Sequence, residues 1–267
     1  MSAQRAGTPA PVAIVTGSAT GVGAAVAHRL AEHGWNLVIN YSSSREAAEA
    51  TATEIAALGV EVELVQANVA EDADCIAVAD AARLRWGRID ALVNNAGVTA
   101  FCPADEMDGL QADDFQRVMA VNVVGSYQMT RACLPLLRES GRGAVVNLSS
   151  QAGLSGLGSS VAYAASKAAL NNMTLALARS LAPEIRVNAV CPGFVNTRWV
   201  RGQMDEETYT RFREHIEAMT PLGRMTEAEE VAELVYFLLC TSAPITGELV
   251  GVDGGNHLTV NAADFEA

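Results

Sequence analysis

The chain has 267 residues, half of them apolar, and a formal net charge of −13. That length favours one large α/β domain with a core that needs no disulfides or metals. A chain this acidic repels nucleic acid and anionic membrane surfaces, so we expect neither as a partner. Its five cysteines are odd in number and widely spaced, which favours small, buried, reduced thiols in the cytoplasm. The four histidines show no metal-ligand spacing, and we expect no metal site.

We expect no targeting signal in the N-terminal residues. Residues 1–11 are small, polar and end in a proline, which is typical of a flexible arm and not of a secretion or transit peptide. The most apolar helical stretch, Leu234–Cys240, is too short to cross a bilayer. We therefore expect no membrane span and a cytoplasmic location.

Short β-branched runs alternate with Ala- and Leu-rich segments of helical spacing along nearly the whole chain. This alternation predicts a parallel sheet covered on both faces. We predict one doubly wound, Rossmann-type α/β domain over residues 12–256, with seven parallel strands, followed by a tail over 257–267. The predicted strands are Val12–Thr16, Asn36–Asn40, Glu61–Gln66, Ile89–Val93, Ala144–Leu148, Arg186–Val190 and Leu249–Val252. The predicted helices are Gly21–His33, Arg45–Leu58, Asp72–Trp86, Asp113–Glu139, Val161–Leu181 and Glu227–Cys240.

Three segments depart from this rhythm. Residues 194–222 hold about a helix pair that mixes aromatic, Met and charged residues after the sixth strand, which fits a substrate lid or, equally, a surface helix pair on the core. The helices Asp113–Glu139 and Val161–Leu181 are apolar on most sides. A sheet covers only one side of a helix, so we expect these two to meet another subunit. The alternative is a wide-faced helix lying under a loop.

A glycine-rich turn joins the first strand to the first helix. Gly17 permits a tight turn, and Gly21 and Gly23 let the backbone and the helix N-terminus approach a pyrophosphate. A plain tight turn is the alternative, but the position at the first strand of an alternating chain favours a dinucleotide.

The second strand ends in Asn40, Tyr41, Ser42 and Ser43, with no carboxylate to grip the ribose 2′-hydroxyl of NAD(H). Hydroxyls and Arg45 would accept a 2′-phosphate, so we predict NADP(H) over NAD(H). Helix capping by Ser43 or Ser44 is compatible with this role.

Tyr163 and Lys167 are one helical turn apart, and Ser150 follows the fifth strand. An ammonium beside a phenol stabilises the phenolate, which predicts that Lys167 lowers the pKa of Tyr163 and makes it a general acid/base. Ser150 would hydrogen-bond the same carbonyl oxygen. Neighbouring strand residues face opposite ways, so Ser150 acts and Ser149 does not. Tyr-x-x-x-Lys alone would be an ordinary helical pair; the combination indicates an active site.

These motifs occur in the order Thr16–Gly23, Asn94–Gly97, Asn122, Ser150, Tyr163/Lys167 and Pro192-Gly193. In this the chain resembles the short-chain dehydrogenase/reductase family over about Val12 to Gly255, and bacterial 3-oxoacyl-carrier-protein reductases in particular. The resemblance implies that Asn94–Gly97 brace the sheet and that Asn122 holds a water in a proton relay from Lys167. It also implies a homotetramer, or a homodimer.

The glycine-rich turn over Thr16–Gly23 is called the cradle below. The cofactor site implied by the cradle and the resemblance comprises Gly17, Ser18, Thr20, Gly21, Val22, Gly23, Asn40, Tyr41, Ser42, Ser43, Asn68, Val69, Asn95, Ala96, Gly97, Tyr163, Lys167, Pro192, Gly193, Val195 and Thr197. The catalytic residues are Asn122, Ser150, Tyr163 and Lys167. Pocket candidates are Thr99, Gln151, Leu157, Phe194 and Trp199, each of which could equally fill the core.

The substrate class follows only from charge. An enzyme that acts on an acidic carrier protein needs basic residues at the entrance to its active site. The Arg138–Arg142 loop supplies two arginines, but the whole chain has a net charge of −13. We therefore favour a small free ketone, sugar or secondary alcohol, with 3-oxoacyl-carrier-protein reduction as the alternative. A non-catalytic dinucleotide-binding redox sensor is a third possibility, which the complete catalytic set disfavours.

Overall fold

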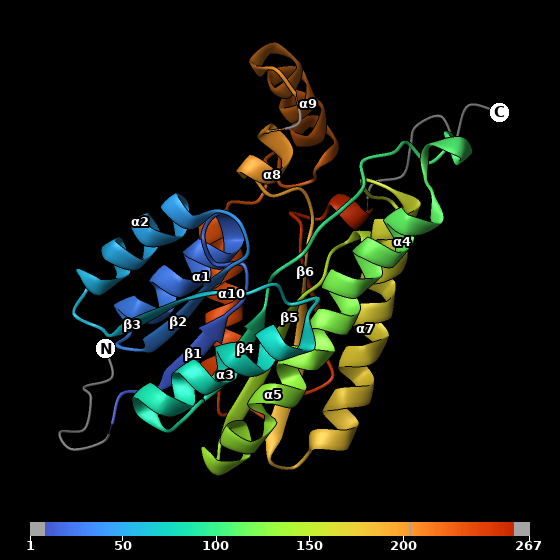
Figure 1. The fold of residues 1–267 in the computed structure, drawn as a ribbon. Coiled ribbons are helices and arrows are strands. Elements are labelled where there is room, and N and C mark those ends of the chain that lie inside the picture. Colours follow the sequence, from blue (N-terminus) through green and yellow to red (C-terminus); the bar gives the residue numbers. More distant parts are fainter. Residues whose placement is uncertain (1–8, 203, 259–267) are drawn as a thin grey trace.

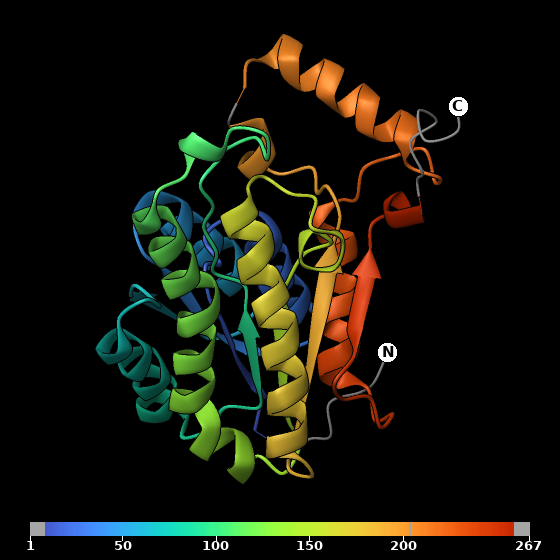
Figure 2. The ribbon, with the colours of Figure 1, turned by 90° about the vertical axis from the view of Figure 1, so that its right-hand side faces the viewer.

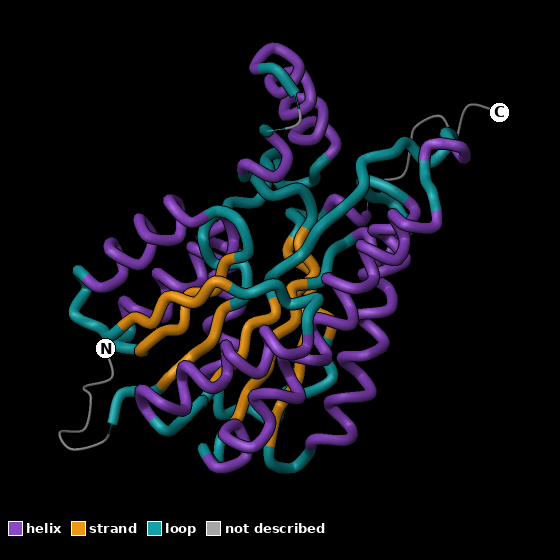
Figure 3. Tube along the Cα trace, in the orientation of Figure 1, coloured by secondary structure: helices purple, strands orange, loops and turns teal. Residues whose placement is uncertain are grey.

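A computed structural model of the chain describes residues 9–202 and 204–258. Seven parallel strands form one sheet in the order β3-β2-β1-β4-β5-β6-β7 (Figures 1 and 3). The predicted doubly wound α/β fold is thereby confirmed. The strands are β1 (Val12–Val15), β2 (Asn36–Tyr41), β3 (Val62–Gln66), β4 (Ala91–Asn94), β5 (Gly143–Leu148), β6 (Ile185–Pro192) and β7 (Leu249–Val252).

Helices cover both faces of the sheet because alternate strand residues point to opposite sides. In β1, Ala13 and Val15 pack toward α1, α2 and α10, whereas Val12 and Ile14 pack toward α3, α5 and α7. The α-helices are α1 (Gly21–Glu32), α2 (Arg45–Ala56), α3 (Asp72–Trp86), α4 (Ala112–Met119), α5 (Ser126–Glu139), α6 (Ala152–Ser155), α7 (Val161–Leu181), α8 (Arg198–Arg201), α9 (Glu206–Met219) and α10 (Ala228–Cys240). Single 3₁₀ turns lie at η1 (Met107–Gly109) and η3 (Asn256–Leu258).

The strand order reverses between β1 and β4, which are neighbours in the sheet although β2 and β3 separate them in the chain. In open parallel sheets, ligands bind outside the carboxyl ends of the strands at such a switch point. The glycine-rich turn after β1 and the Asn94–Gly97 segment after β4 both lie there.

The sequence predicted one continuous helix over Asp113–Glu139, but the structure does not form one there. A π-helical stretch, η2 (Ala120–Gly125), separates α4 from α5. Asn122 lies within it and is fully buried, with its amide bonded to the backbone of Val98. A side chain that bonds outside its helix at this point widens the turn, and π-helical turns are frequent at functional sites.

The 194–222 segment forms the two helices α8 and α9, and α9 stands beyond the carboxyl ends of the strands instead of packing on a sheet face (Figure 2). Phe194 and Phe212 meet edge to face at 5.4 Å, and the Tyr209 hydroxyl donates to Asn196 Oδ1 at 2.5 Å. This position favours the lid over a surface helix pair.

Several sequence-based expectations concern the remaining surface. Of the five cysteines, Cys240 is exposed rather than buried, because it ends α10. The predicted N-terminal arm and C-terminal tail lie outside the described residues, except for 9–11 and 257–258. Within the described part of the chain, no helix combines the length and apolarity that a membrane span requires.

Candidate active site

Gly17, Gly21 and Gly23 shape the turn between β1 and α1 for different reasons. Gly17 and Gly21 have φ of 61° and 59°, which side chains rarely adopt. A Cβ on Gly23 would lie 2.4 Å from Asn95 Nδ2 and 2.5 Å from the carbonyl oxygen of Gly17. Only glycine therefore lets α1 begin so close to the end of β4.

The N-terminus of α1 is open to a ligand. Thr20 occupies the N-cap position but its side chain makes no cap hydrogen bond. Thr197, from the loop after β6, has its Cγ2 3.7 Å from where a Gly21 Cβ would lie. Unpaired N–H groups and the helix dipole favour an anion. The residues present therefore fit the pyrophosphate of a dinucleotide, with Val22 packed beneath it on the core.

The side chains of two predicted cofactor residues, Ser18 and Asn40, are bonded inside the fold. The Ser18 hydroxyl is fully buried and donates to the Val15 carbonyl at 2.7 Å. Asn40 is buried too, its Oδ1 accepting from Gly17 N and its Nδ2 donating to the Ala67 carbonyl. Both side chains brace the cradle.

The 2′-phosphate prediction therefore depends on the remaining residues after β2. Tyr41 is buried, whereas Ser42 and Ser43 are exposed. Arg45 is exposed and pairs with Glu49 at 3.4 Å, one turn along α2. An exposed pair of this kind is weak and can be exchanged for a phosphate.

The end of β4 is tied to the cradle through a residue that sequence reasoning missed. Thr16 Oγ1 accepts the backbone N–H groups of Asn95 and Ala96, each at 3.0 Å. Asn95 Nδ2 in turn donates to the carbonyls of Thr16 and Gly17. A buried threonine just after the first strand was the available signal. Asn94 bridges β4 to β5 by donating to Asn147 Oδ1 at 2.9 Å, which matches the bracing role expected of it.

Asn68 and Val69 follow β3 at the same edge of the sheet. Asn68 is exposed, and its Oδ1 accepts the N–H of Ala70 while its backbone N–H donates to Asp74. Val69 is buried, and its carbonyl lies 2.8 Å from where a Cβ on Gly125 would be. Asn68 is thus the one of the two whose side chain a ligand can reach.

Ser150, Tyr163 and Lys167 meet at the end of β5, as predicted. The Ser150 side chain lies close enough to the Tyr163 phenol to oppose part of the rise in its pKa. The Lys167 Nζ lies 5.6 Å from the centre of the Tyr163 ring and donates to the carbonyl of Leu148 at 2.7 Å. Ser149 faces away from Tyr163, because its hydroxyl is buried and donates to the Lys167 carbonyl.

The pKa values in this site differ from the expectation. Burial raises the pKa of Tyr163 to about 12, and the hydrogen bond with Ser150 only partly opposes this. Burial also lowers the pKa of Lys167 to about 8. The net shift of the Tyr163 pKa is therefore upward, opposite to the predicted acidification, because removing the phenolate from water dominates.

Asn122 joins the segment after β4 to helix α7. Its Nδ2 donates to Ser166 Oγ at 2.9 Å and to the Val98 carbonyl at 3.0 Å. A Cβ on Gly97 would lie 3.4 Å from Asn122 Oδ1 and 3.8 Å from Lys167 Nζ. The side chain of Asn122 thus holds the Val98 backbone, next to Gly97 and Lys167, and also bonds α7.

The end of β6 closes the site. The carbonyl of Pro192 accepts the N–H of Gln151 at 2.8 Å, which joins β6 to the loop after Ser150. Gly193 must be glycine, because a Cβ there would lie 2.7 Å from Asp253 Cβ. Val195 pairs with Thr226 in an isolated parallel bridge. These contacts fix the start of the 194–222 segment.

The five pocket candidates divide into two groups. Thr99 shares a 2.7 Å hydrogen bond with Ser159, and Gln151 is part-buried. Leu157, Phe194 and Trp199 are exposed apolar residues. The Trp199 ring lies 6.3 Å from the Tyr163 ring, so α8 reaches the predicted catalytic tyrosine.

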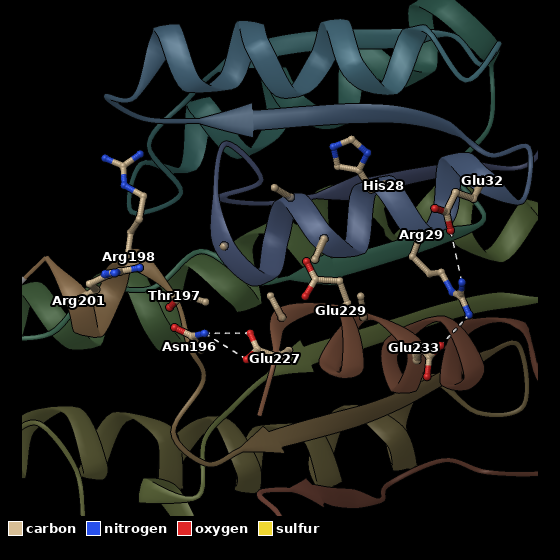
Figure 4. A pocket seen from close by; sticks show the side chains of 15 residues that line it. His28, Arg29, Glu32, Asn196, Thr197, Arg198, Arg201, Glu227, Glu229 and Glu233 are labelled. Atoms are coloured by element: carbon tan, nitrogen blue, oxygen red, sulfur yellow. Dashed lines mark hydrogen bonds and ion pairs between the residues drawn. The ribbon is translucent and has the colours of Figure 1, made fainter. Parts of the chain in front are cut away.

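A cavity of about 600 Å³ lies beside the cradle, between α1 and α10 (Figure 4). Gly21 and Thr197 form its border with the cradle. Asn196 bonds Glu227 and Arg29 bonds Glu233 in its wall, whereas Tyr163 does not line it. This cavity is therefore a groove lined by both glutamates and arginines, and it is separate from the predicted catalytic residues.

Fold and site together define a dinucleotide-binding oxidoreductase, and comparisons with known proteins agree. The enoyl-(acyl carrier protein) reductase family model matches residues 17–257. A Burkholderia xenovorans protein classed as a short-chain dehydrogenase/reductase superposes with a TM-score of 0.87 at 43% identity, covering 94% of this chain and 99% of that one.

Curated relatives match along almost their whole length. The ketoacyl reductase 2 ascribed to the granaticin polyketide synthase of Streptomyces violaceoruber is 40% identical over 93% of this chain and 97% of the relative. The 3-oxoacyl-[acyl-carrier-protein] reductase FabG of Staphylococcus aureus is 36% identical over 92% of this chain and 98% of the relative. The chain belongs to the short-chain dehydrogenase/reductase family.

Proposed function

We propose that the chain is an NADP(H)-dependent enzyme that interconverts a ketone or aldehyde and an alcohol. The meeting of Ser150, Tyr163 and Lys167 beside the glycine cradle carries this proposal. When bound, the nicotinamide supplies the hydride for the carbonyl carbon. Ser150 donates a hydrogen bond to the carbonyl oxygen, and Tyr163 gives that oxygen its proton.

The raised pKa of Tyr163 fits reduction. A phenol with a pKa of about 12 keeps its proton at neutral pH and is still far more acidic than the alcohol that forms. Lys167, whose Nζ lies 5.6 Å from the centre of the Tyr163 ring, stabilises the phenolate left behind. Asn122 holds the Gly97–Val98 segment in place and, we propose, takes part in returning a proton to Tyr163.

A free ketone, sugar or secondary alcohol is the substrate class that charge favours, since a carrier protein is acidic and so is this chain. The Arg138–Arg142 loop does not help a carrier to dock. It precedes β5, so it lies at the amino edge of the sheet, away from Tyr163. The names of the two curated relatives favour the second candidate, reduction of a 3-oxoacyl group on a carrier protein. A cytoplasmic location and a homotetramer or homodimer complete the proposal.

The test is a panel of ketones, aldoses and 3-oxoacyl thioesters, assayed by the absorbance of NADPH and of NADH. We expect turnover of free ketones with NADPH and a loss of at least about 10²-fold in Tyr163→Phe. Turnover with NADH alone would refute the cofactor assignment. A thioester that reacts only when it is attached to its carrier protein would establish the second candidate instead.

A further inference from the structure

The surface beside Tyr163 is aromatic and open. Trp199 extends from α8 to within 6.3 Å of the Tyr163 ring, with the two rings tilted by 46°. Its side chain nevertheless remains 41% exposed. An indole that served only to pack α8 would be buried, because its large apolar area stabilises a fold only when it leaves water.

A second segment beside the same tyrosine carries exposed apolar residues. The loop between α6 and α7 passes the ring, and a Cβ on Gly158 would lie 3.4 Å from Tyr163 Cδ1. The leucine before it, Leu157, is 79% exposed, and Leu154 is 50% exposed. Phe194, on the same segment as Trp199, adds an exposed ring that meets Phe212 of α9. Exposed apolar side chains on segments that reach one polar group are typical of a binding surface.

Two polar pairs on this surface are already bonded internally. Thr99 and Ser159 bond each other at 2.7 Å, and Arg201 on α8 pairs with Glu206 at 2.7 Å. A sugar needs several free hydrogen-bond partners, because each hydroxyl that loses water without replacement costs binding energy. An apolar ring system has no such requirement.

We propose that the substrate is a ketone carrying a flat, apolar ring system that lies against Trp199, and that Trp199 determines this specificity. The inference rests on the proposed function and narrows its substrate class, excluding sugars. Leu157 and Phe194 would cover the remaining edges of the ring system. Tyr163 and Ser150 would meet the carbonyl oxygen at one end of it.

The experiment compares 2-tetralone with 2-butanone under NADPH in three variants. For 2-tetralone, Trp199→Ala should lower kcat/KM about 10- to 100-fold, mainly through KM, whereas 2-butanone should change by no more than about threefold. Trp199→Phe should restore most of the preference, since it keeps an aromatic face. Phe237→Ala is the matched control, because Phe237 is a half-exposed ring on α10, across the sheet from α7. It should change neither ketone.

An equal loss for both ketones in Trp199→Ala would overturn the inference, as would a wild-type preference for 2-butanone or for an aldose. Calorimetric titration of 2-tetralone into the wild type with NADP⁺ separates this from failure of the proposed function. Binding that needs Trp199 without turnover of any ketone would sink the proposed reaction and leave the ring site standing. Turnover of ketones with no such binding would do the reverse.

Discussion

The ammonium of Lys167 donates a 2.7 Å hydrogen bond to the carbonyl oxygen of Leu148, the last residue of β5. The hydroxyl of Ser149 makes the reciprocal contact, donating to the carbonyl of Lys167 at 3.2 Å. Helix α7 is thus bonded twice to the end of β5, one turn beyond Tyr163. These two contacts join α7, which carries Tyr163, to the strand end that carries Ser150.

The pH dependence of reduction should report Lys167 and not Tyr163. Burial lowers the pKa of Lys167 to about 8 and raises that of Tyr163 to about 12. As pH rises through about 8, the lysine loses its charge while the tyrosine keeps its proton. We therefore expect kcat/KM to be level below that pH and to fall with an apparent pKa near 8. Lys167→Arg should shift the fall in rate to higher pH, because a guanidinium stays charged. A wild-type rate that stays level until Tyr163 titrates would contradict this assignment.

Ser150 and Ser149 should respond differently to alanine. Ser150→Ala removes the donor to the carbonyl oxygen and should lower kcat about 10²-fold or more. Ser149→Ala removes only the buried bond to Lys167 and should cost about 1 kcal/mol of stability, with activity largely kept. Ketone-reduction rates and thermal melts measure the two effects. Activity lost in Ser149→Ala and kept in Ser150→Ala would refute the alignment of this strand end.

The sequence predicts the fold well because the spacing of apolar residues and the turn-forming residues between elements are both local features of the chain. The helices Asp72–Trp86 and Val161–Leu181 have the bounds that were expected. The π-helical stretch at Asn122 was not predictable in the same way, since it depends on the distant backbone of Val98. Motif spacing correctly placed Tyr163 near Ser150. Ser150 comes just after β5 and Tyr163 lies in the first turn of α7, so the positions of these two elements bring the residues together.

Burial is the property of the site that spacing along the chain could not predict. Ser18 and Asn40 belong to a matching motif, yet their side chains are buried and bonded inside the fold. The expected acidification of Tyr163 considered only the charge on Lys167, whereas the loss of water around the phenol has the larger effect. How much water a side chain loses depends on the assembled tertiary structure, which spacing along the chain does not contain.

Adding one methyl group to the cradle, at Gly23, should weaken cofactor binding. Gly23→Ala places a Cβ 2.4 Å from Asn95 Nδ2, and the strain of about 1–3 kcal/mol falls on the phosphate site. We expect the Kd for NADPH, measured by fluorescence titration, to rise about tenfold or more. Gly251→Ala in β7 is the control, since its Cβ would meet nothing within 4 Å. Equal affinities in the two variants would show that the cradle does not hold the cofactor.

Cofactor preference should depend on charge after β2. Ser42 is exposed, and Ser42→Asp would place a carboxylate where the proposed 2′-phosphate binds. Like-charge repulsion should raise the KM for NADPH about tenfold or more and leave that for NADH unchanged or lower. Ser42→Asn has nearly the same shape without the charge and should change neither. Equal KM values for NADPH in Ser42→Asp and Ser42→Asn would exclude a phosphate at this position.

The surface formed by η2, α5 and α7 should be a subunit interface. The two long helices lie side by side, and Val124, Tyr127, Val161 and Leu175 are each between 42% and 48% exposed along them (Figure 2). Covering these side chains would bury apolar area that water now contacts, which is the main driving force for association. We expect light scattering after size exclusion to give a dimer or tetramer for the wild type and a smaller species for Leu175→Glu. Leu84→Glu, on the outer face of α3 at 77% exposure, is the matched control and should leave the mass unchanged. A monomeric wild type, or equal masses for the two variants, would assign the apolar faces of α5 and α7 another role.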